Sequence, residues 1–370
     1  MEGGKGGLEG VVACATEICF IDGDAGRLLY RGYEIADLVD SRASFEDVAY
    51  LLWMGCLPTQ KERSDLCQAL DRARDLSPPF EHFLRSLPAG DPMTSLRTAV
   101  SALGLFDGVD TPSPLACATW LTGRLAAIVA AQYRLARGQQ VLASRSDLGH
   151  AANVLYLLFG REPSPLEACV LDVALVLHAD HELNASTFAA RVCSATLADM
   201  YAAITSAVGT LSGPLHGAAN AAANRALEEI GQPERASGWV REHLARGEKI
   251  PGFGHRVYRH RWDPRAVILR SLARDLAQQK GDQRLFAITE ALERAVEGER
   301  ELYPNVDLYS GVVYRLLGIG PELFTPLFAV ARIVGWTAHV MEQYAHNRII
   351  RPRAEYVGPQ PRRVADERLA

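Results

Sequence analysis

The sequence predicts an all-α protein with one small β-hairpin near its N-terminus. Two observations indicate this fold class. Helix-start signals precede apolar-periodic runs along most of the chain, and only residues 15–31 contain two β-prone runs around a turn-rich loop. With 370 residues, the chain can bury a large core, and its length favours two domains or one large domain with an insertion.

The hairpin comes first in chain order, with the loop DGDAG at residues 22–26 between its strands. Helices follow. Capping boxes, in which an N-cap hydroxyl and a glutamate three residues later satisfy each other's backbone N–H groups, are predicted at Thr59–Glu62 and Ser164–Glu167. Further helices are predicted at residues 44–54, 94–106, 199–208, 263–279, 283–298, 307–317 and 321–346, with one more start at Thr111-Pro112.

Apolar helices and cysteine usage indicate a cytoplasmic protein. The helix after Ser164 is apolar nearly all round, which places it in a core. The most apolar stretches, 125–136 and 166–179, are too short or too interrupted to cross a bilayer, so we expect no membrane association. The start MEGGKGGLEG has no apolar region, so we expect no signal peptide. Seven scattered cysteines without a CxxC pair favour reduced thiols.

The segment 249–265, KIPGFGHRVYRHRWDPR, is the strongest candidate for a ligand-binding loop. The chain carries a net charge of −5, yet this segment is rich in arginine. Gly252 and Gly254 allow close approach of the backbone to a ligand, and His255 follows them directly. Local positive charge in an acidic chain indicates an anionic ligand, although a charge run is often only a solvated surface.

A small polyanion fits this loop better than a dinucleotide or a nucleic acid. Val257 stands where a GxGxxG fingerprint needs its third glycine, and no strand leads into the loop. The isoelectric point is about 6.1, and no zinc-finger, homeodomain or RNP pattern accompanies the arginines. The sequence also lacks HExxH, metal-ligand spacing, GxSxG and a P-loop, so we expect no metal and no nucleic-acid partner.

Two histidines outside this loop are candidate site residues. His181 lies in DHELNAS at the end of the buried helix, where a hydrogen-bonded core histidine is the more common role. His216 lies in the tight turn GPLHG, and we expect a helix to begin at or near it. A helix N-terminus disfavours imidazolium, so His216 should stay neutral at pH 7 and donate a hydrogen bond. A capping histidine is the alternative.

An aspartate and two arginines complete the candidate set. Asp307 in PNVDLYSG stands at a predicted helix start, where a plain N-cap aspartate is the common interpretation. Arg332 in the apolar run FTPLFAVARIVGW needs an anionic partner, whereas Arg351 in IIRPRAEY could be a surface residue. Together, arginines that bind a polycarboxylate, an aspartate base and histidines that stabilise oxyanions suit the condensation of an enolised acyl group with a keto acid.

The ordered set of motifs resembles the citrate synthase family, in particular its short bacterial and archaeal type. The resemblance spans nearly the whole chain. The segments that carry it are GLEGVVA (7–13), FIDGDAGRLLYRGYEIADL (20–38), FEDVAYLLW (45–53), LRTAVSALG (96–104), DHELNASTFAAR (180–191), GPLHG (213–217), GFGHRVY (252–258), DPR (263–265), PNVDLYSG (304–311) and IIRPRAEYVGP (349–359).

The resemblance implies a two-domain helical homodimer. A large domain, residues 1–216 plus 325–370, would hold the dimer interface, and a small domain, residues 217–324, would close over the site. The implied reaction condenses acetyl-CoA with oxaloacetate and water to give citrate and CoA, with the thioester as substrate and no cofactor. The alternatives are a 2-methylcitrate synthase that uses propionyl-CoA and a non-catalytic paralogue that binds CoA or a carboxylate.

The resemblance also implies a role for each candidate residue. His216 would hydrogen-bond the thioester carbonyl, Asp307 would remove the methyl proton, and His255 would donate to the oxaloacetate carbonyl. The implied oxaloacetate-binding residues are His181, Arg265, Arg332 and Arg351, and the implied CoA-binding residues are Lys249, Ile250, Pro251, Gly252 and Phe253. Arg332 and Arg351 are 19 residues apart, and the predicted helix to about residue 346 spans roughly 20 Å, so one dicarboxylate would not touch both arginines of one chain unless the segment after Asn347 doubles back. The resemblance implies instead that the arginine of the RPR motif reaches into the partner's site, so we expect Arg351 to act there.

The chain differs from the family pattern at a few places. The loop from His255 to Arg265 is one residue longer, Asp91 replaces the histidine of His-Pro-Met, and Cys14 replaces a common glycine. Ala218 and Ala221 stand where a glycine and a glutamate or glutamine are common. None of these changes removes an implied catalytic group. The chain also lacks the N-terminal extension of the NADH-regulated bacterial type, so we expect a dimer without that control.

Overall fold

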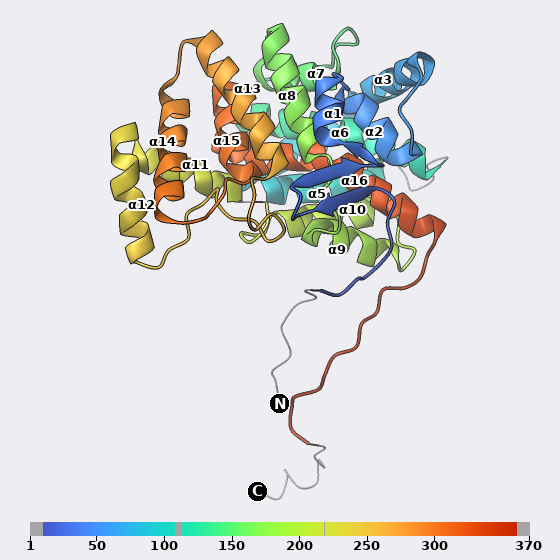
Figure 1. Cartoon of the computed structure of the whole chain (residues 1–370). Coiled ribbons are helices and arrows are strands. Elements are labelled where there is room, and N and C mark those ends of the chain that lie inside the picture. The colour runs from blue at the N-terminus through green and yellow to red at the C-terminus, as the bar shows by residue number, and fades with distance from the viewer. Residues whose placement is uncertain (1–9, 108–112, 218, 361–370) are drawn as a thin grey trace, which may run out of the picture.

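The computed structural model describes residues 10–107, 113–217 and 219–360. Helices form almost the whole body, and a small sheet lies on its surface (Figure 1), which confirms the predicted fold class. The N-terminal and C-terminal segments both extend from the same side of the body as extended arms (Figure 1).

The sheet contains the predicted hairpin and one strand more. Strands β1 (Cys19–Asp22), β2 (Arg27–Tyr30) and β3 (Tyr33–Glu34) are antiparallel in the order β1-β2-β3, with Cys19 opposite Tyr30. Asp22 closes the turn, since its Oδ1 accepts a hydrogen bond of 2.8 Å from the backbone N–H of Ala25. The two-residue strand β3 was not predicted, because so short a run carries no period-two pattern.

The helices of the first part of the chain are α1 (Ile35–Asp40), α2 (Phe45–Met54), α3 (Gln60–Arg74), α4 (Pro78–Ser86), α5 (Pro92–Phe106), α6 (Pro114–Leu135), α7 (His150–Phe159), α8 (Pro165–His178), α9 (Ala185–Ser194) and α10 (Met200–Leu211). Those of the second part are α11 (Ala219–Ile230), α12 (Ala236–Ala245), α13 (Pro264–Lys280), α14 (Arg284–Glu299), α15 (Val306–Leu316) and α16 (Phe324–Ala345), with 3-10 turns η1 (Pro233–Arg235) and η2 (Pro321–Leu323).

The predicted capping boxes are confirmed at the starts of α3 and α8. Helix α5 begins before the predicted residue 94, because Asp91 is its N-cap and accepts a bond of 2.7 Å from the backbone N–H of Thr94. The predicted helix start at Thr111-Pro112 lies outside the described residues, and α6 is described from Pro114 with Ser113 as its cap. Helix α10 continues past its predicted end to Leu211.

Helix α16 runs through the core and packs against α2, α6, α8, α9 and α10. By length and composition, the segments 114–135 and 321–345 could cross a membrane, but most of their residues are buried inside the protein, as in core helices. Gly335 lets α16 pass close to the end of α8, because a Cβ there would lie 2.3 Å from the carbonyl oxygen of Ala179 and 2.4 Å from Asp180 Oδ1.

Helices α11 to α15 gather at one end of the body (Figure 1). Within this group α13 and α11 pack on α15, and α12 packs on α14. The group reaches the rest of the protein through contacts of α13 and α15 with α8 and of α11 with α16. It falls inside the residues 217–324 expected to form the small domain, and the division into two domains stays a prediction.

Candidate active site

The loop 249–265 is joined to the chain just before α15. The backbone N–H of Gly254 donates to the carbonyl of Tyr303 (2.8 Å), and that of Asn305 donates to Gly252 (2.9 Å). Gly252 and Gly254 have φ of 85° and 77°, a region that favours glycine, so both glycines are needed to shape the loop. As a result, His255 lies beside the helix start that carries Asp307.

His255 is held as a neutral hydrogen-bond donor. Its Nδ1 accepts from the backbone N–H groups of Val257 (3.0 Å) and Tyr258 (3.3 Å). A ring nitrogen that accepts carries no proton, which assigns the proton to Nε2. Burial, and after it the charge of Arg265, lowers the pKa of His255 to about 4. His255 is therefore neutral at pH 7 with Nε2–H available to a ligand.

His216 carries its proton on the other ring nitrogen from His255. It lies in the turn before α11, and its Nε2 accepts from the backbone N–H of Ser186 (3.3 Å) and lies 2.8 Å from Ser186 Oγ. Its proton is thus assigned to Nδ1. Burial and then Arg332 lower its pKa to about 4. The predicted neutral state is confirmed, but burial is its main cause, and the described part of α11 begins only at Ala219.

Ser186, which orients His216, is not among the predicted site residues. Trp336 Nε1 donates to Ser186 Oγ (3.1 Å), so helix α16 fixes the serine that fixes the histidine. Ser186 lies in the same DHELNAS motif as His181, but no local spacing links it to His216, which follows 30 residues later. Only the tertiary fold shows this contact.

Asp307 is the second residue of α15 and not its cap. Asn305 is the N-cap, and its side chain accepts from the backbone N–H of Asp307 (3.0 Å), so the plain N-cap interpretation of Asp307 is wrong. Among the described residues, no side chain or backbone group hydrogen-bonds or ion-pairs with the Asp307 carboxylate. Burial raises its pKa to about 6, while Arg265 opposes and Asp263 adds to the shift. A free carboxylate with this pKa suits a general base.

Arg265 is buried and paired. Its Nε donates to Asp263 Oδ1 (2.9 Å) and its NH2 to Asp263 Oδ2 (2.7 Å). The same Oδ2 accepts from the backbone N–H of Val306 (3.2 Å), which ties α13 to the start of α15. This partner was not predicted as part of the site, although the DPR motif places an aspartate two residues before the arginine.

Arg332 is only 1% exposed, yet no described carboxylate lies within ion-pair distance of it. Its Nε donates to the carbonyl of His178 (2.7 Å), and its guanidinium carbon lies 4.8 Å from the centre of the Phe328 ring. Burying an unpaired charge is costly, so this arginine is placed to receive an anionic ligand.

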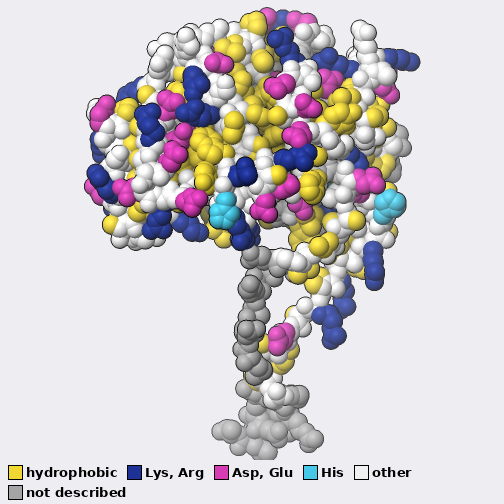
Figure 2. Space-filling view, in the orientation of Figure 1, with side chains coloured by type: hydrophobic (Ala, Val, Ile, Leu, Met, Phe, Trp, Pro, Cys, Tyr) yellow, Lys and Arg dark blue, Asp and Glu magenta, His cyan; other side chains and the backbone are white. Residues whose placement is uncertain are grey.

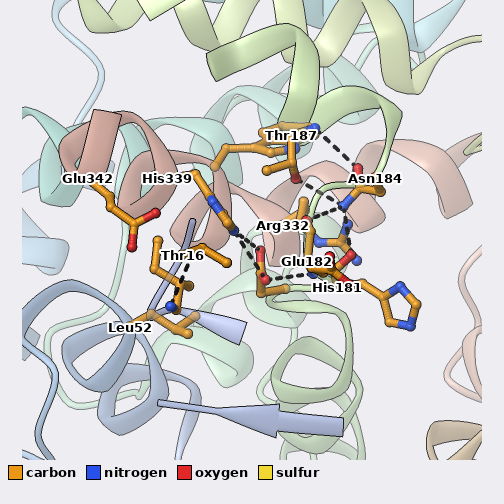
Figure 3. A network of polar contacts seen from close by, with 12 residues as sticks. Thr16, Leu52, His181, Glu182, Asn184, Thr187, Arg332, His339 and Glu342 are labelled. Carbon is orange, nitrogen blue, oxygen red and sulfur yellow. Dashed lines mark hydrogen bonds and ion pairs between the residues drawn. The ribbon is translucent and has the colours of Figure 1, made fainter. Parts of the chain in front are cut away.

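His181 belongs with these groups and not with the core. Its Nε2 lies 3.4 Å from Tyr258 Oη, and its ring centre lies 5.3 Å from that of His255. Figure 3 shows its ring pointing away from the polar contacts around Asn184 and Glu182. Burial, followed by the charges of Arg265, His255 and Arg332, lowers the pKa of His181 well below its ordinary value. The end of α8, the loop 249–265, α13 and α16 thus converge here.

Arg351 stands apart from the other predicted site residues. Arg351 is exposed in the C-terminal arm, where Figure 2 shows basic side chains, and this chain does not bring it to the other arginines. Of the predicted CoA-binding segment, Ile250 is buried, Lys249 is exposed, and Phe253 pairs with Pro304 in an isolated β-bridge.

In the described part of the chain, no group of three or more His, Cys, Asp or Glu side chains is arranged to hold a metal ion.

Known proteins similar to this chain show its family. The family model described as "Citrate synthase, C-terminal domain" matches residues 7–353. The chain belongs to the citrate synthase family. It is 48% identical over 361 residues to citrate synthase 2 of Bacillus subtilis, with 95% of each chain covered. It is also 40% identical to the 2-methylcitrate synthase of Shewanella oneidensis, with 97% of this chain and 96% of the relative covered.

A solved citrate synthase from the archaeon Thermoplasma acidophilum has the same fold. It matches with a TM-score of 0.90 and 34% identity, over 96% of this chain and 97% of the other. That structure is described as a ternary complex with carboxymethyl coenzyme A and oxaloacetate. The likeness covers 96% of this chain, so the citrate synthase fold accounts for nearly all of it.

Proposed function

We propose that this member of the citrate synthase family condenses acetyl-CoA with oxaloacetate and water to give citrate and CoA. The observation that supports it most is one set of complementary groups. Among the described residues, the carboxylate of Asp307 has no partner, and the neutral histidines His216 and His255 have free N–H groups at Nδ1 and Nε2 respectively. These are a base and two donors, as the condensation of an enolised thioester with a ketone requires.

The reaction divides between these three residues. Asp307 removes a proton from the acetyl methyl group, and the Nδ1–H of His216 hydrogen-bonds the thioester oxygen as negative charge develops on it. The Nε2–H of His255 then donates to the keto oxygen of oxaloacetate as the new carbon–carbon bond forms. Water hydrolyses the resulting citryl-CoA to citrate and CoA.

The arginines account for the second substrate. Arg332 has no ion-pair partner among the described residues and Arg265 shares the site, so both are placed to bind carboxylates of oxaloacetate beside His181. Arg351 completes this set from a second copy of the chain, because its own arm leads away from the body. The backbone of residues 249–253 binds CoA, and the protein works as a cytoplasmic homodimer without a cofactor or metal.

A thiol-release assay tests the proposed reaction. We expect free CoA to appear with acetyl-CoA only when oxaloacetate is present. No release with acetyl-CoA or propionyl-CoA would contradict the proposal and favour a non-catalytic relative. The similarity to a named 2-methylcitrate synthase makes propionyl-CoA the second acyl donor to test. Selectivity between the two thioesters can be small, because one methyl group is worth only about 1–3 kcal/mol. Comparable kcat/KM for acetyl-CoA and propionyl-CoA would assign both reactions to the protein.

The activity should depend on pH through Asp307. Its carboxyl must be ionised to accept a proton, and its pKa is raised to about 6, so kcat/KM for acetyl-CoA should rise as pH increases through about 6 and then level off. His216 and His255, each with a pKa of about 4, stay neutral across this range and add no second step. Samples returned to neutral pH before assay control for acid unfolding. A profile that is flat between about pH 5 and 8 would contradict this role.

A further inference from the structure

A buried polar network lies behind the oxaloacetate side of the site, on the face of α16 that meets α8 and α9. His339 and Asp180 are both fully buried, and His339 Nε2 lies 3.4 Å from each carboxylate oxygen of Asp180. Figure 3 shows His339 reaching towards the segment that carries Glu182 and His181. The proposed mechanism does not use either residue, although Asp180 directly precedes His181 in the chain.

Arg191 sets the tautomer of His339. Its NH1 lies 3.1 Å from His339 Nδ1, and a guanidinium can only donate, so Nδ1 is the acceptor and Nε2 carries the proton. The Nε2–H therefore points at the Asp180 carboxylate. Arg191 is itself held by Glu342 (2.6 Å) and Gln343 (3.1 Å). This order gives the network one direction of donation, from Arg191 to His339 to Asp180.

Asp180 in turn holds a strained piece of main chain. Its Oδ2 accepts from the backbone N–H of Glu182 (3.0 Å), and Glu182 has φ of 51°, which non-glycine residues rarely adopt. Such a conformation persists only where surrounding contacts enforce it. His181 lies between the two residues, so the position of its ring depends on this contact.

The main chain of Asp180 is also held by Tyr30, whose Oη donates to the Asp180 carbonyl (3.0 Å) and accepts from the Asp180 N–H (3.3 Å), but the Asp180 carboxylate has few partners besides His339. The backbone of α16 approaches so closely that Gly335 has no room for a Cβ beside Asp180 Oδ1. Burial raises the pKa of Asp180, but His339, Arg332 and the Cys19 thiol together lower it below its ordinary value, so the group is a carboxylate. Without the His339 donor, a buried carboxylate would keep only the Glu182 N–H and the thiol, and a shift of residues 180–182 would be the least costly response.

We propose that His339 is a positioning residue for oxaloacetate binding, which acts through Asp180 on the main chain that carries His181 and does not touch the substrate. The inference rests on the proposed function, because His181 is assigned there to oxaloacetate. It extends the site from the residues that face the ligand to a second set, Arg191, His339 and Asp180, buried behind them.

The test compares His339→Phe, His339→Asn and His339→Gln. Phenylalanine removes both ring nitrogens, asparagine can keep an acceptor for Arg191 but does not reach Asp180, and glutamine can offer an amide N–H to Asp180. His150→Phe is the matched control: His150 is 1% exposed and accepts from an arginine in the same way, with Arg74 NH1 3.3 Å from its Nδ1, but it lies in α7 away from the site.

We expect His339→Phe and His339→Asn to raise KM and Kd for oxaloacetate on the order of tenfold, below the 10²-fold that a misplacement of about 1 Å can cost. KM for acetyl-CoA should change less than about twofold, His339→Gln should restore most of the oxaloacetate affinity, and His150→Phe should lower Tm without changing KM. The Kd is measured by calorimetry with oxaloacetate alone, so it does not depend on turnover.

Two results would overturn the inference. One is that His339→Phe behaves like His150→Phe, with a lower Tm and an unchanged affinity for oxaloacetate. The other is equal oxaloacetate KM for the asparagine and glutamine variants, which still decides the question if the phenylalanine variant does not fold. Thiol release by the wild-type protein reports separately on the proposed function, so failure of one proposal is not mistaken for failure of the other.

Discussion

Replacing Asp307 with asparagine is expected to lower kcat by about 10²–10⁴-fold, the range that a general base contributes. Asparagine has nearly the same shape but cannot accept the methyl proton. The carboxylate has no partner among the described residues, so the substitution breaks no contact, and the α15 start stays capped by Asn305. Oxaloacetate affinity, measured by calorimetry, should therefore remain near that of the wild type.

Asp172→Asn is the matched control for Asp307→Asn. Asp172 lies on α8, its pKa is raised to about 7 by burial and by Glu46, and its Oδ1 accepts from the backbone N–H of Phe45. Like Asp307, Asp172 has a carboxyl group with a raised pKa, but it lies outside the site. Replacing it with asparagine should therefore leave kcat unchanged. If Asp307→Asn retains more than a few per cent of wild-type kcat, another group is the base.

Mixing two inactive variants should restore about a quarter of the wild-type activity. In a dimer of Asp307→Ala with Arg351→Ala, one site carries both lesions and the other carries neither, provided that Arg351 serves the partner's site. Random pairing on co-expression makes about half of the dimers mixed, and half of their sites are intact. Thiol release by the purified mixture, compared with each parent, measures the recovery.

Co-expression of Asp307→Ala with Arg332→Ala provides the control for that recovery. Both residues belong to the site of one chain, so every site of the mixed dimer keeps one lesion and no activity should return. If the Arg351 mixture stays as inactive as this control, Arg351 does not act in the partner's site.

Local signals made much of the fold predictable. The capping boxes at Thr59 and Ser164, the hairpin turn at residues 22–26 and most helix boundaries depend on residues within four positions of one another. Errors arose where two candidates competed for one role. Asp91 and not Thr94 starts α5, and Asn305 and not Asp307 caps α15, because both neighbours have suitable side chains and only the folded backbone selects one.

Candidate site residues could be named from the sequence, but Ser186 and Asp263 were missed and the contacts between segments could not be predicted. The family motifs identified the candidate residues, yet the contact of Ser186 with His216 and that of His339 with Asp180 join segments 30 and 159 residues apart. No spacing rule reaches so far. The main cause of the low pKa of His216 was missed for the same reason. The sequence suggested a helix start beside this histidine, whereas burial and the charge of Arg332, which lower its pKa, depend on tertiary packing.

The C-terminal arm, which carries Arg351 away from the body, has a consequence for how the protein behaves on dilution. If the arm supplies an essential group to a second copy, a separated subunit has no complete site, and activity per chain must fall once the total protein concentration drops below the dissociation constant of the pair. Progress curves started by rapid dilution would then slow over time at the rate of subunit separation. Oxaloacetate, which binds the completed site, would delay that decay by mass action.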